Sequence, residues 1–350
     1  MQLFNICIFI KSKLNLNSTL LAYFYKNLIL DISNYKALFL EHLEDKIYVK
    51  EPKNLYEPIT YIISIGGKRL RPILTLMSCD LFGGNYKNAL DAALAIEMFH
   101  NFSLVHDDIM DNAPLRRGSE TVHEKWNLNT GILSGDAMLV LTNQLFETYN
   151  DKQYKELMVL FNQTALKVCE GQQLDIDFEN RDDVSIVEYI KMISYKTAVL
   201  VAASLKMGAM IAEANTEEAQ KIYEYGLNLG IAYQLQDDYL DVFGQENFGK
   251  QRAGDIIENK KTWLYLKTLT LANSDDNNRL TTLYNTKKKD NDAVNLVIDL
   301  FEKYDIPNLV KSQISVYTGK AFESCNQLSL TVSDKKKLID FGNNLMSRKI

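Results

Sequence analysis

The stretch NALDAALAIEMFHNFSLVHDDIMD, residues 88–111, decides the fold class of this chain. Its apolar residues have helical spacing, and Glu97 is the single acidic residue between Asp91 and Asp107. A helix that is apolar on nearly all sides is normally buried in a protein core. Pro114 follows and interrupts helical hydrogen bonding. We therefore predict a deeply buried helix that ends in a group of carboxylates.

A second stretch of this kind, KIYEYGLNLGIAYQLQDDYLDVFG, spans residues 221–244. Gly226 and Gly230 lie four positions apart and so share one face of the helix. Each glycine costs about 1 kcal/mol relative to alanine inside a helix, and we expect close approach of another helix to compensate. Long segments elsewhere also have helical spacing. The sequence predicts one large all-α domain with deeply buried central helices.

The first thirty residues carry no motif. The apolar segment 3–10 is too short to span a bilayer, and it lacks the basic leader and cleavage site of a signal peptide. We therefore divide the chain into an N-terminal extension, residues 1–30, and one helical domain, residues 31–350. Within this domain the polar segment 272–292 predicts a surface connection that has room for a short helix.

Charge and cysteine content exclude several classes of protein. The formal net charge is −6, which argues against non-specific binding of nucleic acid. The four cysteines are far apart and form no CxxC pair, so neither a disulfide framework nor a zinc site is expected. Reduced thiols are the rule in the cytoplasm. We expect a cytoplasmic protein with no nucleic-acid partner and no stable insertion into a membrane.

Three carboxylates lie close together at the end of the first buried helix. Asp107 and Asp111 are four residues apart and share a helix face, whereas Asp108 lies about 100° around the axis. Left unpaired beside apolar residues, these charges would be costly. A hard cation such as Mg²⁺ removes this cost because it prefers carboxylate oxygens. The alternative is a solvated acidic helix end.

The same spacing recurs at the end of the second helix. QLQDDYLD, residues 234–241, contains Asp237, Asp238 and Asp241. A second copy of the motif on a second buried helix favours the functional interpretation over the solvated helix end. We predict a shared cavity with carboxylates on opposing walls.

Basic residues near these motifs suggest what the metal would bind. Magnesium seldom occupies an all-protein cage and usually bridges to phosphate. Arginine side chains suit phosphate oxygens because their donors form a planar fork. Each basic residue alone is more often solvated surface. The candidates are Lys68, Arg71, Arg116, Arg117, Lys196, Lys250 and Lys260.

Five motifs in order carry a resemblance to a known family. They are GGKRLRP (66–72), DDIMD followed by LRRG (107–118), GQQLD (171–175), YKT (195–197) and QLQDDYLD (234–241). In this order they resemble the trans-polyprenyl diphosphate synthase family, and most of all its farnesyl and geranylgeranyl diphosphate synthases. The resemblance implies an isoprenoid synthase-type bundle of roughly a dozen helices around a deep central cavity, usually in a homodimer.

The resemblance also implies the reaction. A short-chain trans-prenyltransferase of this family condenses isopentenyl diphosphate head-to-tail with dimethylallyl, geranyl or farnesyl diphosphate. The products are a C15–C20 prenyl diphosphate and pyrophosphate. Three Mg²⁺ ions are expected between the two aspartate motifs, where they neutralise the leaving group.

The motif positions assign roles to individual residues, each as the resemblance implies it. The metal ligands are Asp107, Asp108, Asp111, Asp237, Asp238 and Asp241. Isopentenyl diphosphate is assigned to Lys68, Arg71, His100 and Arg117. The allylic diphosphate is assigned to Arg116, Lys196, Lys250 and Lys260. Thr197 and Gln234 would offer oxygen dipoles to the developing cation. The catalytic group comprises Asp107, Asp108, Asp111, Arg116, Lys196, Thr197, Gln234 and Asp237.

Product length is assigned to the residues that precede the first motif. In the family a bulky side chain five positions before the motif commonly forms the floor of the chain pocket. Here that residue is Phe102, with the small Ser103 beside it and Phe99 farther back. We expect a C15 or C20 product, and the alternative role of Phe102 is simple core packing. His106 is expected to be a packed or hydrogen-bonded residue and not a base.

Other functions remain open at this point. A longer-chain polyprenyl diphosphate synthase differs only in the depth of its pocket. A non-catalytic subunit of a heteromeric synthase typically loses acidic motif residues, and both motifs are intact here. A terpene cyclase lacks the full isopentenyl diphosphate site, and a helical metal-binding protein leaves the basic residues unexplained.

Overall fold

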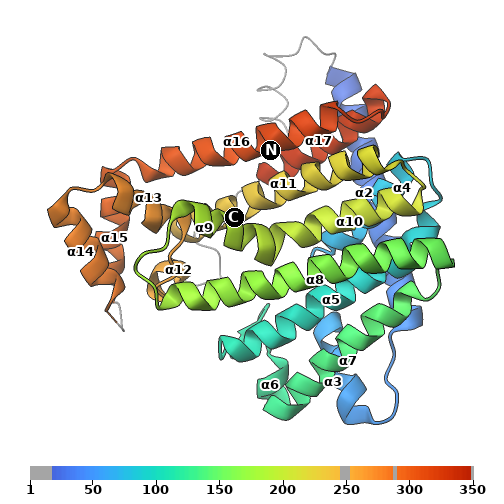
Figure 1. Ribbon diagram of the computed structural model, residues 1–350, viewed down its shortest axis with the longest axis horizontal. Coiled ribbons are helices and arrows are strands. Elements are labelled where there is room, and N and C mark those ends of the chain that lie inside the picture. The colour runs from blue at the N-terminus through green and yellow to red at the C-terminus, as the bar shows by residue number, and fades with distance from the viewer. Residues whose placement is uncertain (1–17, 245–252, 287–289, 348–350) are drawn as a thin grey trace.

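Helices make up most of the computed structural model, which describes residues 18–244, 253–286 and 290–347 (Figure 1). The α-helices are α2 (Ser18–Lys46), α3 (Lys53–Ser64), α4 (Leu70–Leu81), α5 (Leu90–Met110), α6 (Val122–Lys125), α7 (Leu128–Phe146), α8 (Asp151–Glu179), α9 (Ile186–Ile193), α10 (Val199–Ile211), α11 (Thr216–Phe243), α12 (Gly254–Ile257), α13 (Trp263–Leu271), α14 (Ser274–Tyr284), α15 (Asn291–Lys303), α16 (Ile306–Asn326) and α17 (Val332–Met346). A 3₁₀-helix, η1 (Tyr86–Ala89), precedes α5, and a π-helix, η2 (Ser194–Ala198), joins α9 to α10. The predicted all-α fold is confirmed.

Strand structure is confined to one hairpin in the residues described. Strands β1 (Leu115–Arg116) and β2 (Ser119–Glu120) pair antiparallel, with Leu115 opposite Glu120. Arg117 and Gly118 form the turn, and both have positive φ angles, 53° and 79°. Two successive positive φ angles suit a tight two-residue hairpin turn, which explains the glycine that follows the arginine pair.

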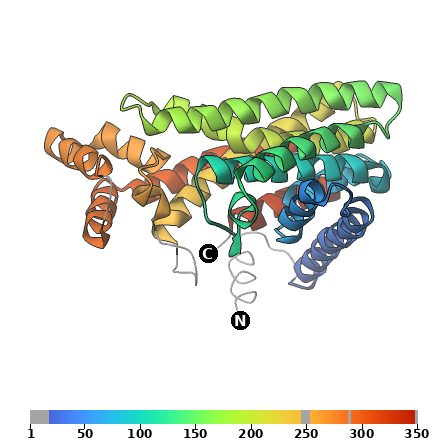
Figure 2. The same ribbon diagram turned by 90° about the horizontal axis from the view of Figure 1, so that it is seen from below.

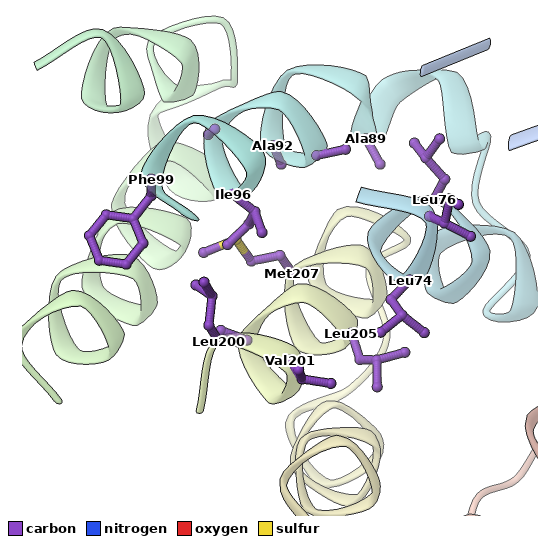
Figure 3. Close-up of a cluster of buried hydrophobic side chains, with 14 of the residues drawn as sticks. Leu74, Leu76, Ala89, Ala92, Ile96, Phe99, Leu200, Val201, Leu205 and Met207 are labelled. Carbon is purple, nitrogen blue, oxygen red and sulfur yellow. The ribbon is translucent and has the colours of Figure 1, made fainter. Parts of the chain in front are cut away.

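The core is built around α5, as the first stretch predicted. This helix packs against α4, α7 and α10, and its residues from Ala92 to Phe99 are buried. Figure 3 shows Ile96 and Phe99 of α5 beside Leu200 and Met207 of α10. Helix α5 is covered on several sides, and its buried segment leads to the carboxylates at its C-terminal end.

The two glycines of α11 lie at close contacts, as predicted. A Cβ atom on Gly226 would lie 2.8 Å from the Cα of Ala202 in α10, and one on Gly230 would lie 2.7 Å from the Cα of Ala198 in η2. Real Cβ atoms essentially never come this close, so larger residues would push the helices apart. The glycines therefore let the middle of α11 pack closely against α10 and η2.

The C-terminal ends of α5, α8 and α11 lie on the same side of the molecule (Figure 1). Helices α13–α15 gather beyond that end, as the view from below also shows (Figure 2). The two predicted acidic motifs are therefore brought to one region. Helix α14 lies within the segment 272–292, for which a surface connection with a short helix was predicted.

Helix α2 crosses the predicted division between residues 30 and 31, because it runs from Ser18 to Lys46. The assignment of residues 1–30 to an extension stays a prediction. Among the residues described, no helix is both long and apolar enough to cross a membrane.

Candidate active site

A cavity of about 320 Å³ lies between the C-terminal halves of α5 and α8. Asp107, Lys196 and Thr197 line one part of it, and Phe99 and Phe102 line another. On α5 the two phenylalanines precede Asp107 by eight and five residues, so the wall changes from charged to aromatic along the helix. The cavity therefore joins a polar end to an apolar compartment.

The first motif divides into one buried and two more accessible carboxylates. Asp108 is only 1% exposed, and the Nε of Arg116 donates to both of its oxygens at 2.7 and 2.8 Å. Asp107 Oδ1 is buried without a hydrogen-bond partner among the residues described; the Nζ of Lys196 lies 3.7 Å away. Desolvation and the charge of Asp107 raise the pKa of the Asp111 carboxyl to about 6. This end of the cavity fits a cation.

The second motif is held by a hydrogen-bond network. Asp238 is 4% exposed; its Oδ1 accepts from Gln234 Nε2 at 3.0 Å, and its Oδ2 accepts from the Tyr189 hydroxyl. Burial and the charge of Asp255 raise the pKa of Asp238 well above its ordinary value. Asp241 Oδ2 accepts from the backbone N–H of Asp255 at 3.0 Å. The network anchors the end of α11 to α9 and α12.

Lys196 and Thr197 connect the two motifs through η2. The Nζ of Lys196 lies 2.6 Å from Asp175 Oδ2 in α8 and 3.7 Å from Asp107 Oδ1 in α5. The Thr197 hydroxyl donates to Gln234 Oε1 at 3.2 Å. Burial lowers the pKa of Lys196, but the charges of Asp175 and Asp107 outweigh it, so the net shift is upward. Lys196 is therefore held charged between α5 and α8.

The π-helical turn of η2 depends on Gly171, the glycine of the GQQLD motif. A Cβ atom on Gly171 would lie 2.2 Å from the backbone nitrogen of Lys196. Turns of this type recur at functional sites because they interrupt the regular helix and redirect its side chains. The glycine thus permits α8 to touch the backbone that presents Lys196 and Thr197.

A basic group lies beside the cavity. The Nη1 of Arg71 donates to His100 Nε2 at 3.1 Å, and both residues line the cavity wall. Burial and the charges of Arg71 and Arg117 lower the pKa of His100 well below its ordinary value, so the imidazole is neutral. Arg117 donates to the carbonyl of Gly66, and a Cβ atom on Gly67 would lie 2.8 Å from its Nη1. The glycine pair therefore cradles the guanidinium.

The remaining predicted basic residues differ in their structural surroundings. Lys68 is exposed in the loop before α4, and Lys250 lies outside the residues described. Lys260 lies 2.8 Å from Glu258 and 3.9 Å from Asp255, and it counters the upward shift in the pKa of Asp111. In the part of the chain that is described, no three His, Cys, Asp or Glu side chains converge into a ready-made metal centre.

Several residues of the site were not assigned from the sequence. Asp175 lies in the GQQLD motif, but the motif alone does not show that it pairs with Lys196. Tyr189 occurs in an ordinary amphipathic helix and carries no sequence signal for its contact with Asp238. His106 is packed and hydrogen-bonded as expected: its ring meets Phe102 edge-on, and its Nε2 donates to the carbonyl of Ile132 at 3.2 Å.

A cavity that is polar at one end and aromatic at the other, with two acidic helix ends and a basic group in the same region, suits a helical protein that binds anionic substrates with apolar chains. The family described as polyprenyl synthetase matches residues 52–301, and this chain belongs to that family. The match confirms the resemblance and the predicted transfer of prenyl groups.

Known relatives cover most of the chain. A geranylgeranyl diphosphate synthase of Saccharolobus solfataricus is 38% identical over 301 residues, which cover 83% of this chain and 88% of the relative. A short chain isoprenyl diphosphate synthase of Methanothermobacter thermautotrophicus is 38% identical over 282 residues, covering 79% and 85%. The crystal structure of a geranylgeranyl pyrophosphate synthase matches with a TM-score of 0.88 and 48% identity, covering 91% of this chain and 99% of that one.

Proposed function

We propose that this chain condenses isopentenyl diphosphate head-to-tail with an allylic diphosphate and that its main product is a C20 prenyl diphosphate. The observation that carries the proposal is the cavity that runs between Asp107 and Lys196 at one end and an aromatic wall at the other. The names of the relatives, geranylgeranyl diphosphate synthases among them, support a C20 product over a C15 product.

We further propose that three Mg²⁺ ions bind between the motifs, held by Asp107 and Asp111 of α5 and by Asp237 and Asp241 of α11. The buried Oδ1 of Asp107, which accepts no hydrogen bond from the described residues, supports this assignment. Bound there, Mg²⁺ supplies the positive charge that makes pyrophosphate a good leaving group.

Asp108 and Asp238 belong to the same motifs, but they are the two of the six aspartates that are buried, and their oxygens are the least accessible to an ion. An ion could reach Asp108 only by displacing Arg116, and Asp238 only by displacing Gln234 or Tyr189. We propose that these two aspartates act on the metal site by orienting the helix ends and the guanidinium of Arg116. This refines the prediction that all six aspartates are ligands.

The basic residues divide between the two substrates. Arg116 and Lys196 stand beside Asp107 and are placed to meet the allylic diphosphate. Lys260, and Lys250 outside the described residues, are assigned to the same substrate from their positions in the sequence. Arg71, His100 and Arg117, with Lys68 in the same loop region, form the site for the diphosphate of isopentenyl diphosphate. The Nε of Arg71 is buried without a hydrogen-bond partner in the described ranges, so it retains a free donor for a phosphate oxygen.

The apolar compartment then protects the reaction from water. The allylic cation forms beside Thr197 and Gln234, whose oxygen dipoles face positive charge favourably. Phe102 and Leu200 line the space that receives the hydrocarbon chain. The double bond of isopentenyl diphosphate attacks the cation, and the released pyrophosphate takes the proton. A dry cavity is required because water would quench the cation.

We also propose that the chain forms a homodimer in the cytoplasm. Helix α7 carries one charged residue, Asp136, and exposes Leu133 and Val140, while α8 exposes Leu166. Exposed apolar residues that recur along neighbouring helices support a protein interface.

A product assay tests the proposed function. Purified protein, Mg²⁺ and labelled isopentenyl diphosphate are combined separately with dimethylallyl, geranyl and farnesyl diphosphate, and the dephosphorylated products are sized. A C20 prenol from each primer supports the proposal, and a C15 prenol keeps the activity but shortens the product. Products beyond C25 indicate a longer-chain synthase. Absence of condensation by folded protein indicates a subunit that needs a partner.

A further inference from the structure

A buried ion pair lies beneath the basic group and outside the cavity wall. Arg69 is 5% exposed and Glu97 is 4% exposed, and the Nη1 of Arg69 donates to Glu97 Oε1. The Nη2 of Arg69 donates to the carbonyl of Ile63 at the end of α3. Asn101 Nδ2 completes the network by donating to Glu97 Oε1 at 3.4 Å and to its carbonyl at 2.8 Å. One side chain therefore ties α3 to α5.

The backbone of Arg69 has an uncommon conformation. Its φ and ψ angles, 53° and 36°, place it in the left-handed region immediately before α4. A non-glycine residue keeps this conformation only where the surrounding structure holds it. In this structure the contacts with Glu97 and Ile63 stabilise the left-handed conformation of Arg69. They thereby fix the turn that leads from Gly66 and Gly67 into α4.

The turn set by this pair carries the contacts of the basic group. Arg71 follows Arg69 by two residues and meets His100, which follows Glu97 by three residues on α5. Arg117 docks on the other side of the turn, on the carbonyl of Gly66. The Arg69–Glu97 pair therefore fixes the distance between α5 and the 66–71 turn. The positions of the Arg71 and Arg117 guanidinium groups depend on that distance.

The charges around His100 agree with a supporting role for the Arg69–Glu97 pair. Besides burial, the charges of Arg71, Arg117, Arg116 and Arg69 lower the pKa of His100. Burial lowers the pKa of Arg71 and of Arg117, and the charge of Glu97, which also pairs with Arg69, opposes that shift. Since Arg69 is satisfied by Glu97 and by a carbonyl, it cannot bind a substrate in this arrangement. Arg71, which lines the cavity wall, and Arg117 are left as the cations that can meet the substrate.

We propose that Arg69 and Glu97 are positioning residues for the diphosphate of isopentenyl diphosphate. These two residues do not touch the substrate. They hold the turn of residues 66–71 in place, so that Arg71 and Arg117 converge on the substrate's diphosphate. The inference rests on the proposed function and deepens it. It concerns one substrate only, because Arg116 and Lys196, proposed for the allylic diphosphate, are held by Asp108 and Asp175 and not by this pair.

The test measures the affinity for each substrate separately. Isopentenyl diphosphate alone, and farnesyl diphosphate with Mg²⁺, are titrated calorimetrically into the wild type, into Glu97→Gln and into a double variant, Arg69→Met with Glu97→Leu. The double variant replaces the pair by apolar side chains, a change that folds often tolerate. We expect the Kd for isopentenyl diphosphate to rise about tenfold or more in both variants, as is usual when a supporting residue is lost. The Kd for farnesyl diphosphate should change less than about twofold.

The matched control is Tyr149→Phe. The Tyr149 hydroxyl donates to the carbonyl of Asn88 at 2.8 Å and accepts from the N–H of Ala92, so it braces the opposite end of α5. This variant should lose stability without losing affinity for either substrate. Equal weakening of both substrates, or an unchanged affinity for isopentenyl diphosphate in the folded double variant, overturns the inference. A wild type that binds no isopentenyl diphosphate overturns the proposed function instead.

Discussion

Phe102 is the residue that we expect to limit the length of the product. Its ring contacts Phe99 at a centroid distance of 5.5 Å and His106 at 4.8 Å, so it stands in an aromatic cluster. Phe102 and Phe99 both line the cavity, whereas Phe146 packs in the same cluster behind Phe161 and outside the cavity wall. The cluster therefore offers both a test residue and a control.

Replacing Phe102 by alanine should lengthen the product by at least one five-carbon unit. The truncation opens about one helical turn of space, roughly 5.4 Å, which is close to the length of one isoprene unit. The measurement is the size distribution of the dephosphorylated prenols. Phe146→Ala should destabilise the protein by about 3–5 kcal/mol without changing product length. An unchanged distribution in Phe102→Ala would leave Phe102 with a packing role alone.

Tyr189→Phe should raise the Mg²⁺ concentration needed for half-maximal activity. The substitution removes the hydroxyl that donates to Asp238, so a buried carboxyl loses one of its two partners. Loss of such a partner costs about 1–3 kcal/mol of stability and lets the end of α11 shift. The measurements are denaturant unfolding and a Mg²⁺ titration of activity.

Tyr225→Phe is the control for Tyr189→Phe. Tyr225 is also buried in a helix, and its hydroxyl donates to the carbonyl of Leu338 at 2.8 Å, outside the motifs. It should lower the free energy of unfolding without shifting the Mg²⁺ requirement. The same Mg²⁺ dependence in wild type and Tyr189→Phe would show that the hydroxyl does not support the metal site.

His100 should make the protein less stable at mildly acidic pH. Its folded pKa is lowered by burial and by neighbouring arginines, whereas an unfolded histidine titrates near about 6.5. Between the two values the unfolded chain binds the extra proton, so stability is full above pH of about 6.5 and falls as the pH is lowered. The loss from this group is at most about 1.4 kcal/mol per pH unit.

The measurement is the free energy of unfolding between pH 7.5 and 5.5, compared with His100→Gln. We expect the wild type to lose more stability across this range than the variant, because the variant cannot bind the proton in its unfolded state. Parallel pH profiles would mean that His100 takes up its proton equally in the folded and the unfolded protein.

At the scale of helices, periodicity predicted α5 and α11 well because their burial depends on apolar residues that are visible in the sequence. It also predicted the tight contacts of Gly226 and Gly230, since glycine inside a helix needs a compensating contact. The π-helical turn of η2 was not predicted, because it depends on contact with Gly171 more than twenty residues away. The pairings of Arg69 with Glu97 and of Tyr189 with Asp238 were missed for the same reason: each partner lies on a distant element.

Gly171→Ala tests the contact between α8 and η2. The added methyl group would lie 2.2 Å from the nitrogen of Lys196, so the backbone that presents Lys196 and Thr197 must move. A displacement of about 1 Å in positioned catalytic groups can cost on the order of 100-fold in rate. We expect kcat to fall by about that factor.

Gly319→Ala in α16 is the matched control for Gly171→Ala. A Cβ atom on Gly319 meets nothing within 4 Å among the residues described. Alanine is the better helix former by about 1 kcal/mol, so this variant should keep its activity and gain stability. Equal activity of the two variants would show that η2 tolerates displacement.

At the scale of the whole molecule, the exposed apolar residues lie on α8, which lines the cavity, and on α7, which packs against the α5 wall of the cavity. Helix α8 supplies Val168 and Gln172 to the cavity wall, and α7 packs against α5. Leu133 and Val140 of α7 are 60% and 59% exposed, and Leu166 of α8 is 61% exposed. An interface on these helices would therefore stiffen the two walls between which the substrate chain lies.

The double substitution of Leu133 and Val140 by lysine should convert a dimer into a monomer. Both residues lie on one face of α7, seven positions apart, so two like charges would be buried in a symmetric contact and repel across it. The measurement is the sedimentation mass at micromolar concentration. Val332→Lys is the control, since Val332 is 87% exposed at the start of α17, away from α7 and α8. We expect the control to keep the mass of the wild type.

Because α8 carries both Leu166 and the cavity wall, the monomer should also show a lower kcat while its helical circular dichroism is retained. A wild type that sediments as a monomer would leave the apolar face for a different partner.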